Sequence, residues 1–578
     1  MSKKYLAGLF VVIVVLGLGG YWFYGQKTAD APAIMTLPPA QALGFFHVPG
    51  LPQAWADLRQ TKFFQQVSSP AFWQRALGPE GYRHLIEEKQ RLEQHLGLPL
   101  TESTVNLLLD REFGLAFVPS REKIVDVIVY VRVSGTEKLA ESLPRTFSGA
   151  MQDVVRQTQT VDGFEIVTLR PQEAPTGMSY AFLGTLAVLS TDPAWVIDAI
   201  EARRGTAPDR LHTTPAFQAM QLASPEPLLA YGYYDGERTQ AHVRDRLPGA
   251  SRAPSAATLQ MLQTTGKVTL QARRAGDGVM VETMAWYPPA GATQVFRHAE
   301  RDGAVPPFRG VPAETFYLTH VDLLNLQGLW QLLRQLAAVG HQDVLQQRLA
   351  EFRDWAGVDL ERDVLPVLTG VASLGITAPF GSQRHSPIAL PGVFLTLGLT
   401  DESRGQQLIQ TIVAHAGGPL FLAFLQRQLH DGHSIYYLGH PLLFVNPGYV
   451  ISRQQLILGS DVSLLQHMLD AATGKTNTLT DTDAYRDIRK HFRIKGGSIT
   501  FVDVNTGVEN VRDAWLRLGG FIQALMRLDT GARAVGSMQG DPWALLELFR
   551  PIRYIGMASQ AEAQGVRTEA FVAIEDLR

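Results

Sequence analysis

The chain repeats itself, and this internal duplication constrains its fold more than any other feature. Segment 161–166 matches segment 430–435, and the block LAVLSTD that ends at Asp192 matches the block LILGSD that ends at Asp461. Asp192 and Asp461 lie 269 positions apart, and the neighbouring matched blocks keep nearly the same offset. Self-similarity at a fixed offset indicates repeated structural units. The sequence therefore predicts two copies of one unit.

The matched starts and ends of the two copies give the domain boundaries. LGFFHV opens the first copy and FYLTHV opens the second. We place the first repeat at 41–288 and the second at 313–578. A polar linker that contains Pro and Gly, at 289–312, joins them. Residues 25–40 form a short stalk before the first repeat.

Each copy combines strand and helix patterns. Apolar runs that favour strands are interspersed with amphipathic stretches that favour helices. Asp162-Gly163 and Asp431-Gly432 each stand between two strand patterns, and Asp-Gly favours a hairpin turn that needs φ > 0. Consecutive hairpins predict an antiparallel sheet with helices on one face, which is the α+β class. The predicted architecture is two tandem α+β repeats, each with its own antiparallel sheet, after a single N-terminal transmembrane helix.

The N-terminus has the pattern of a membrane anchor. Residues 5–24 form an uncharged apolar run, and a helix of that length spans about 30 Å, the thickness of the hydrocarbon core. Aromatic residues at the end of the run suit the bilayer surface, and lysines before it favour a cytoplasmic N-terminus at residues 1–4. The residues expected to define the anchor are Lys3, Lys4, Tyr21, Trp22 and Tyr24.

This pattern predicts a single-pass protein of the inner membrane with its C-terminal body in the periplasm. The alternative is a cleaved signal peptide, but the nearest A-x-A patterns, at 29–31 and 31–33, lie far from the apolar run. Removing residues 1–27 removes three lysines, which leaves 49 basic and 55 acidic residues and a net charge of -6. A mildly acidic body does not favour lying flat on an anionic membrane.

The composition excludes several classes of chemistry. Cysteine is absent, which rules out thiol nucleophiles, disulfides and thiolate-bound metals, and which fits an oxidising periplasm. The 52 basic residues do not outnumber the 55 acidic ones, so the sequence does not predict nucleic-acid binding. The sequence contains no nucleophile elbow, zinc-protease helix or dinucleotide fingerprint. We expect no cofactor.

One histidine pattern has the spacing of a metal site. His430, His433 and His440 form H-x2-H-x6-H, and neutral imidazoles bind zinc or copper. The first repeat lacks histidine at the corresponding positions, and no carboxylate stands at a telling spacing. We therefore interpret the three as surface histidines beside a turn, and we expect no resident metal.

Six polar positions recur in both copies. An Asp before a helix suggests an N-cap, an Asp at a strand end suggests a turn cap, and a His at a strand end can satisfy a backbone group. Structural roles are thus the favoured interpretation. The equivalent pairs are His47 with His320, Asp192 with Asp461, and Asp235 with Asp503.

Three helical stretches are unusually apolar, at 323–336, 419–429 and 521–528. Most helices of this kind pack in a core. The functional alternative is an exposed groove that accepts acyl chains or a partner helix.

The predicted anchor, the duplicated unit and the entry PA-x-x-LGFFHVPG at 39–50 together resemble a bacterial family of envelope proteins, known as a domain of unknown function. The resemblance covers most of the region after the anchor, and its motifs are diffuse apolar patterns. It implies an envelope location and a duplicated architecture. It carries no catalytic residues onto this chain.

Three hypotheses for the function follow. The first is a membrane-anchored, non-enzymatic scaffold or accessory subunit that binds another envelope protein, and it predicts an exposed apolar patch. The second is a carrier or sensor of a hydrophobic ligand such as lipid, which predicts an enclosed apolar cavity. The third is a hydrolase, which predicts a His, a carboxylate and a nucleophile that converge in a cleft.

Overall fold

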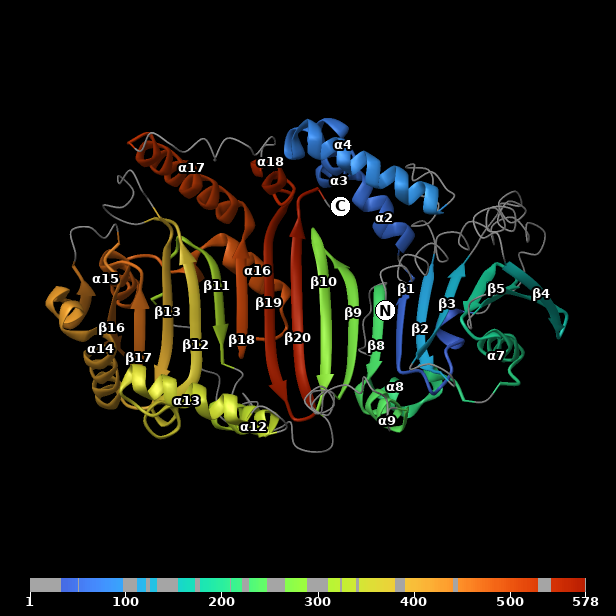
Figure 1. Ribbon diagram of the computed structural model, residues 1–578, viewed down its shortest axis with the longest axis horizontal. Helices are drawn as coiled ribbons and strands as arrows, with labels where there is room; N and C mark the ends of the chain where they lie inside the picture. Colours follow the sequence, from blue (N-terminus) through green and yellow to red (C-terminus); the bar gives the residue numbers. More distant parts are fainter. Residues whose placement is uncertain are drawn as a thin grey trace.

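The structure is a computed structural model whose described strands form one antiparallel sheet of 20 strands (Figure 1). The described residues are 33–49, 51–96, 112–120, 125–132, 154–171, 177–207, 209–220, 228–246, 266–287, 310–322, 325–338, 342–379, 390–439, 445–528 and 542–576.

The strands fall into two sets of ten. In the first half they are β1 (Gly44–Val48), β2 (Phe113–Pro119), β3 (Val125–Arg132), β4 (Val154–Val161), β5 (Phe164–Pro171), β6 (Met178–Leu183), β7 (Leu186–Ser190), β8 (Leu228–Asp235), β9 (Lys267–Ala275) and β10 (Gly278–Trp286). In the second half they are β11 (Thr315–Val321), β12 (Leu368–Thr377), β13 (Gly392–Leu399), β14 (Leu425–His430), β15 (His433–Leu438), β16 (Gly448–Ser452), β17 (Gln455–Gly459), β18 (Ser498–Asp503), β19 (Ile552–Glu562) and β20 (Gly565–Ile574).

The two halves have the same topology. From the outer edge to the centre, the first half runs β4-β5-β6-β7-β3-β2-β1-β8-β9-β10. The second half runs β14-β15-β16-β17-β13-β12-β11-β18-β19-β20. Equivalent strands take the same position in the two halves. For example, β11 corresponds to β1 and β18 corresponds to β8.

The prediction of a separate sheet in each repeat is wrong. Strands β10 and β20, the last strand of each half, pair antiparallel from Gly278 opposite Ala573 to Trp286 opposite Gly565. An edge strand leaves a row of N–H and C=O groups unpaired, and pairing the two equivalent edges satisfies both rows at once. The sheet is therefore continuous across the repeats. The mixture of strands and helices still has the character of an α+β fold.

The predicted transmembrane helix is also not supported. Residues 5–24, with Lys3 and Lys4 before them, lie outside the described residues, as does the first half of the stalk, 25–32. Among the helices that the structure describes, none is long and apolar enough to cross a membrane. The predicted single-pass topology, membrane partner and inner-membrane location all depended on this helix. They are therefore not supported either.

Local chemistry accounts for the hairpins at the two outer edges of the sheet. Asp162 and Gly163 have φ of 55° and 82° between β4 and β5, and Asp431 and Gly432 have φ of 49° and 78° between β14 and β15. Two consecutive residues with φ > 0 are what a type I′ turn requires, and Asp-Gly tolerates them. The same turn therefore closes the same hairpin in both halves.

Helices cover one face of the sheet and frame the strand ends (Figure 1). The described α-helices are α2 (Leu51–Gln60), α3 (Lys62–Val67), α4 (Pro70–Leu96), α7 (Pro193–Arg204), α8 (Pro215–Met220), α9 (Gly236–Arg246), α12 (Leu326–Ala338), α13 (Gln342–Ala356), α14 (Glu402–Phe424), α15 (Val462–Ala472), α16 (Asp483–His491), α17 (Val504–Leu528) and α18 (Pro542–Glu547).

Two equivalent cores lie on the covered face. In the first half, Val196 and Ile200 of α7 pack with Phe45 and Tyr130 of the sheet. In the second half, helices α15 and α16 cover the corresponding strands, and Phe501 is buried among their side chains. Burying an apolar side chain of this size contributes about 1.5–3 kcal/mol. These cores fix which face of each strand points away from the helices.

Candidate functional site: an open apolar face

The face opposite the two cores carries a mainly apolar surface across the middle of the sheet. Directly opposed residues of antiparallel strands lie on the same face, so the strand registers trace rows across the sheet. One row crosses eight strands from β12 to β8, which is about 34 Å at about 4.8 Å per strand. Its members are Leu374, Thr319, Thr500, Met557, Ala570, Val281, Ala272 and Ala230.

Two parallel rows flank it. The first consists of Ile376, Tyr317, Val502, Ile555, Val572, Val279 and Arg274. The second consists of Ser498, Ser559, Thr568, Thr283, Leu270, Gly232, Phe46 and Leu115. We call these three rows the apolar floor.

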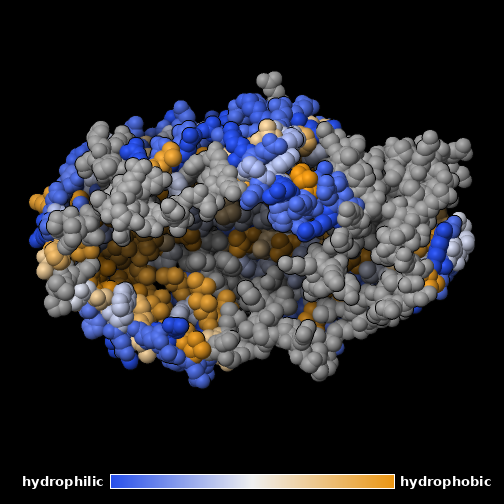
Figure 2. Space-filling view, turned by 45° about the horizontal axis from the view of Figure 1, so that its top comes forward, coloured by the Kyte–Doolittle hydropathy of each residue, from blue (hydrophilic) through white to orange (hydrophobic). Residues whose placement is uncertain are grey.

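The floor is accessible. Met557 is 41% exposed, Leu374 is 42% exposed and Phe46 is 38% exposed. Figure 2 shows a hollow lined with hydrophobic residues between the helices at the two ends of the strands. Large exposed apolar surfaces of this kind mark binding sites for ligands or other macromolecules.

The hydroxyl groups of the floor bond to one another. The Ser559 and Thr568 hydroxyls lie 2.9 Å apart, and the Thr319 hydroxyl donates to the Tyr317 hydroxyl at 3.0 Å. The Thr319 and Thr500 hydroxyls lie 3.3 Å apart. Because these groups bond to one another, across strands or along β11, the floor presents less polarity than its composition suggests.

Ionised side chains in the three rows are confined to one margin. Arg274 is the one Lys, Arg, Asp or Glu among the floor residues, and its guanidinium is paired with Asp57 of α2. The carboxylates of the central strands are on the opposite, covered face. Glu282 is 6% exposed and Glu569 is 1% exposed. At the centre of the sheet both faces are therefore largely apolar, and the two carboxylates are buried on the covered face among Met280, Met284 and Phe571. An antiparallel sheet covered on one face usually has polar side chains on the other.

The buried glutamates have different partners. The Glu282 carboxylate accepts from the Arg273 guanidinium at 3.0 Å. The Glu569 carboxylate accepts from the backbone N–H groups of Arg493 and Ile494 at 2.7 and 3.1 Å. Sequence reasoning missed this pair. The available signal was the motif G-V-x-x-E, which begins β10 and β20 alike.

The predicted histidine pair lies on the covered face, away from the floor. His47 Nε2 lies 2.9 Å from a Glu112 carboxylate oxygen, and His320 Nδ1 lies 2.9 Å from the Ser373 hydroxyl. Both histidines are buried, and each has a side-chain partner at a neighbouring strand: Glu112, directly before β2, and Ser373 in β12. Burial alone would raise the pKa of Glu112, but hydrogen bonds from His47 and Arg132 outweigh it and lower that pKa.

The equivalent aspartates Asp192 and Asp461 begin helices. Asp192 accepts from the backbone N–H of Ala194 at the start of α7, and Asp461 accepts from that of Ser463 at the start of α15, both at 2.9 Å. Asp461 also accepts from the backbone N–H of Asn446 at 3.2 Å. Each Asp supplies the N-cap of the helix that covers its half of the sheet.

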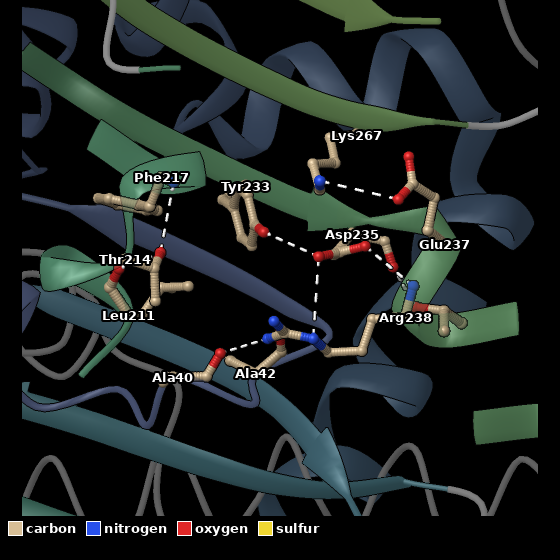
Figure 3. A network of polar contacts seen from close by, with 11 residues as sticks. Ala40, Ala42, Leu211, Thr214, Phe217, Tyr233, Asp235, Glu237, Arg238 and Lys267 are labelled. Atoms are coloured by element: carbon tan, nitrogen blue, oxygen red, sulfur yellow. Dashed lines mark hydrogen bonds and ion pairs between the residues drawn. The ribbon is translucent and has the colours of Figure 1, made fainter. Parts of the chain in front are cut away.

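Asp235 and Asp503 terminate β8 and β18. The Asp235 carboxylate accepts from the Arg238 backbone N–H at 2.9 Å and from the Tyr233 hydroxyl at 3.1 Å (Figure 3). Arg238 in turn donates to the carbonyls of Ala40 and Ala42. The Asp503 carboxylate accepts from the backbone N–H and the hydroxyl of Thr506 at 3.0 and 2.9 Å. Both aspartates hold the first turn of the following helix.

The predicted H-x2-H-x6-H cluster is not assembled by the described residues. His440 lies outside them, and His433 Nε2 lies 3.5 Å from the Ser452 hydroxyl. His430 instead meets two aspartates, with Nε2 2.9 Å from Asp470, and potential ligand atoms of His430, Asp431 and Asp470 lie within 4.8 Å of one another.

A lysine already occupies this acidic cluster. The Lys475 ammonium pairs with Asp431 and lies 3.7 Å from Asp470. The hydrogen bond to Asp431 raises the pKa of Lys475 and lowers the pKa of Asp431. Lys475 supplies the positive charge that a metal ion would otherwise provide. We therefore interpret the cluster as an ion-pair network rather than as a metal centre.

The apolar stretches are placed differently from one another. Stretch 323–336 largely coincides with α12. Stretch 419–429 is a helix only as far as Phe424, after which β14 begins at Leu425. Stretch 521–528 lies in α17, in a part whose side chains are outside the described set.

Comparisons with known proteins do not identify a family for this chain. No family model matches the chain, and no curated protein matches it. Solved structures of TP0453 in crystal forms III and I are similar to part of the chain, with 10% identity and TM-scores of 0.24 and 0.23. They cover 46% of this chain and 83% and 82% of their own. Similarity this weak carries no argument about fold or function.

Proposed function

We propose that the protein is a non-enzymatic binding protein that holds an elongated apolar ligand of the lipid class on its open face. The observation that carries the proposal is the mainly apolar open face at the centre of the sheet. Glu282 and Glu569 face the covered side, whereas Val281, Ala570 and Met557 face solvent. Exposing these apolar side chains costs hydrophobic free energy that a bound apolar ligand recovers.

The floor suits acyl chains better than an extended polypeptide. An extended peptide would bury its own N–H and C=O groups against the floor. Each buried group without a partner costs about 1–3 kcal/mol. The floor hydroxyls already bond to one another, as Ser559 does to Thr568, and the strands at the centre are fully paired. Acyl chains carry no such groups. The floor spans about 34 Å across its eight strands, which is long enough to hold an extended acyl chain.

The hydrolase hypothesis gains no support from the described residues. A hydrolase needs a nucleophile that a substrate can reach. The described His320–Ser373 pair has suitable spacing at 2.9 Å, but these residues are 1% and 2% exposed. A substrate carbonyl cannot approach Ser373 in this arrangement.

Titration with a long-chain fluorescent fatty acid tests the proposal. Met557→Asp places a carboxylate in the middle of the floor, and we expect it to weaken binding by about tenfold or more, because the charge loses its hydration beneath the chain. Leu429→Asp is the matched control, because Leu429 is 69% exposed on β14 at the outer edge of the sheet. Equal affinity for the wild type and both variants would overturn the proposal, and so would failure of the wild type to bind.

A second candidate function is binding of an amphipathic helix from a partner protein. The observation that favours it is a group of exposed apolar side chains on α17, namely Val511, Trp515 and Leu516. Exposed apolar side chains on a helix suit a partner helix. A photoreactive amino acid at position 516 should then form one defined protein adduct in cells, and one at position 429 should not. Lipid adducts alone at position 516 would refute this candidate.

A further inference from the structure

A polar hollow of about 730 Å³ lies where the first repeat meets the ends of two floor strands. Helices α3 and α4 form one side of it, and α18 with the ends of β19 and β20 forms the other. The lining residues used below are Lys62, Gln65, Gln66, Arg75, Glu547, Arg550 and Glu575.

The ion pairs around this hollow do not include Arg550. Lys62 donates to Glu575 at 2.9 Å and lies 3.2 Å from the Asp576 carboxylate, and Arg75 is paired with Glu547. These pairs join helices of the first repeat to the end of the second. Arg550 also lines the hollow, and its guanidinium forms no ion pair with any residue in the described part of the chain. With Asp576 beside Lys62, three carboxylates accompany the three cations, so the charges balance overall and Arg550 is the cation that none of these carboxylates pairs with.

Neutral donors lie beside that cation. The side-chain amides of Gln65 and Gln66 line the same hollow. They have no hydrogen-bond partner within the described ranges. A guanidinium with adjacent N–H donors suits a phosphate group, because guanidinium N–H groups pair with two phosphate oxygens at once.

The hollow lies at one margin of the apolar floor. Glu575 directly follows β20, and Val572 of the floor is three residues earlier, which is about 10 Å along a strand. The pairing of Arg274 on the floor with Asp57 of α2 places the α2–α4 wall at the same margin. A ligand on the floor can therefore reach the hollow with its polar end.

We propose that this hollow binds the phosphate group of a phospholipid whose acyl chains lie on the apolar floor, with Arg550 as the principal anion ligand. The inference rests on the proposed function and adds a headgroup class and an orientation to it. A phosphate in the hollow would fix one end of the ligand, whereas the floor alone lets an apolar chain slide.

The test compares two water-soluble short-chain lipids that share the same acyl chains, a phosphatidic acid and a diacylglycerol, by calorimetric titration of the full-length protein. We expect phosphatidic acid to bind about tenfold more tightly, because it adds a charge-assisted hydrogen-bond pair. Arg550→Gln should abolish that preference and Arg550→Lys should keep most of it. Arg404→Gln, an exposed arginine on α14, is the control and should keep all of it.

The outcomes separate the two proposals. If both lipids bind equally and Arg550→Gln changes neither, the headgroup site is refuted while the floor stands. If neither lipid binds, the proposed function itself fails. If inorganic phosphate binds in an Arg550-dependent manner but phosphatidic acid shows no preference over diacylglycerol, the hollow is a site for free phosphate and the lipid inference is refuted.

Discussion

Glu282 and Glu569 lie directly opposite each other on β10 and β20, and each stands four residues after the glycine that begins its strand. A residue of one repeat thus pairs with its own counterpart in the other. Only one point on a seam between two equivalent strands has this property, and it marks the local pseudo-twofold axis. The two carboxylates are buried at that point, on the face away from the apolar floor.

Removing the charge partner of Glu282 should destabilise the seam. Arg273→Gln leaves a buried carboxylate without its cation, which costs about 3–5 kcal/mol. Glu282→Gln should cost a similar amount, since the Arg273 side chain is nearly as buried as that of Glu282, at 11% and 8% exposed. The double variant Arg273→Gln/Glu282→Gln should recover much of the loss. Denaturant unfolding monitored by circular dichroism measures all three. A double variant no more stable than Arg273→Gln would show that the pair is not coupled.

Two glycines keep the seam strands close, and both should resist substitution. A Cβ on Gly278 would lie 2.3 Å from the Val572 carbonyl oxygen, and a Cβ on Gly565 would lie 2.3 Å from that of Ala285. Relieving such overlap costs about 1–3 kcal/mol. We expect Gly278→Ala and Gly565→Ala each to lower the midpoint of thermal unfolding. Gly232→Ala on β8 is the control, since its Cβ would meet nothing closer than 3.4 Å. Equal midpoints for all three would contradict the seam geometry.

Glu112 should make the stability of the fold depend on pH in the acidic range. Its pKa is lowered in the folded state by hydrogen bonds from His47 and Arg132, which overcome the opposing effect of burial. A lowered pKa means that the carboxylate stabilises the fold above its unfolded pKa of about 4.5, and that this contribution is lost as the pH falls through the folded value. Glu112→Gln should therefore lower stability at neutral pH and flatten its decline below about pH 4.5. Unfolding midpoints between pH 7 and pH 3 provide the comparison, and parallel curves for wild type and variant would refute the assignment.

The two helix caps should differ in strength. Asp192→Ala and Asp461→Ala each remove an N-cap, which costs about 0.5–2 kcal/mol. Asp461 also accepts from the backbone N–H of Asn446, so its loss should cost more than that of Asp192. Asparagine at either position retains a capping oxygen and should restore most of the stability. The prediction is wrong if Asp192→Ala is the more damaging variant in chemical denaturation.

Local chemistry was readable from the sequence, whereas contacts between distant segments were not. The Asp-Gly turns and the capping role of Asp192 depend on two or three adjacent residues, and those interactions form whatever surrounds them. The pairing of β10 with β20 depends on which exposed edges meet after each repeat has folded. Hydrophobic alternation gives the period of a strand but not which repeat covers its edge.

The apolar floor could not be predicted from the sequence for a more specific reason. The usual rule places polar side chains in water and apolar ones in the core. Applied to β10 and β20, that rule puts Glu282 and Glu569 outside and Val281 and Ala570 inside. The structure instead buries both carboxylates beside Met280 and Phe571, because Arg273 and two backbone N–H groups satisfy them. Val281 and Ala570 remain on the open face. A strand that violates the rule is where a functional surface is expected.

The central claim is that the apolar floor binds a lipid, and photoaffinity mapping tests it most directly. The full-length protein is irradiated with a diazirine-bearing fatty acid, and labelled peptides are identified by mass spectrometry. The account predicts labels on β10, β19 and β20, at or beside Val281 and Met557, and competition by unlabelled fatty acid. Labels confined to residues outside the three rows of the floor, or labels that excess fatty acid does not displace, would contradict it.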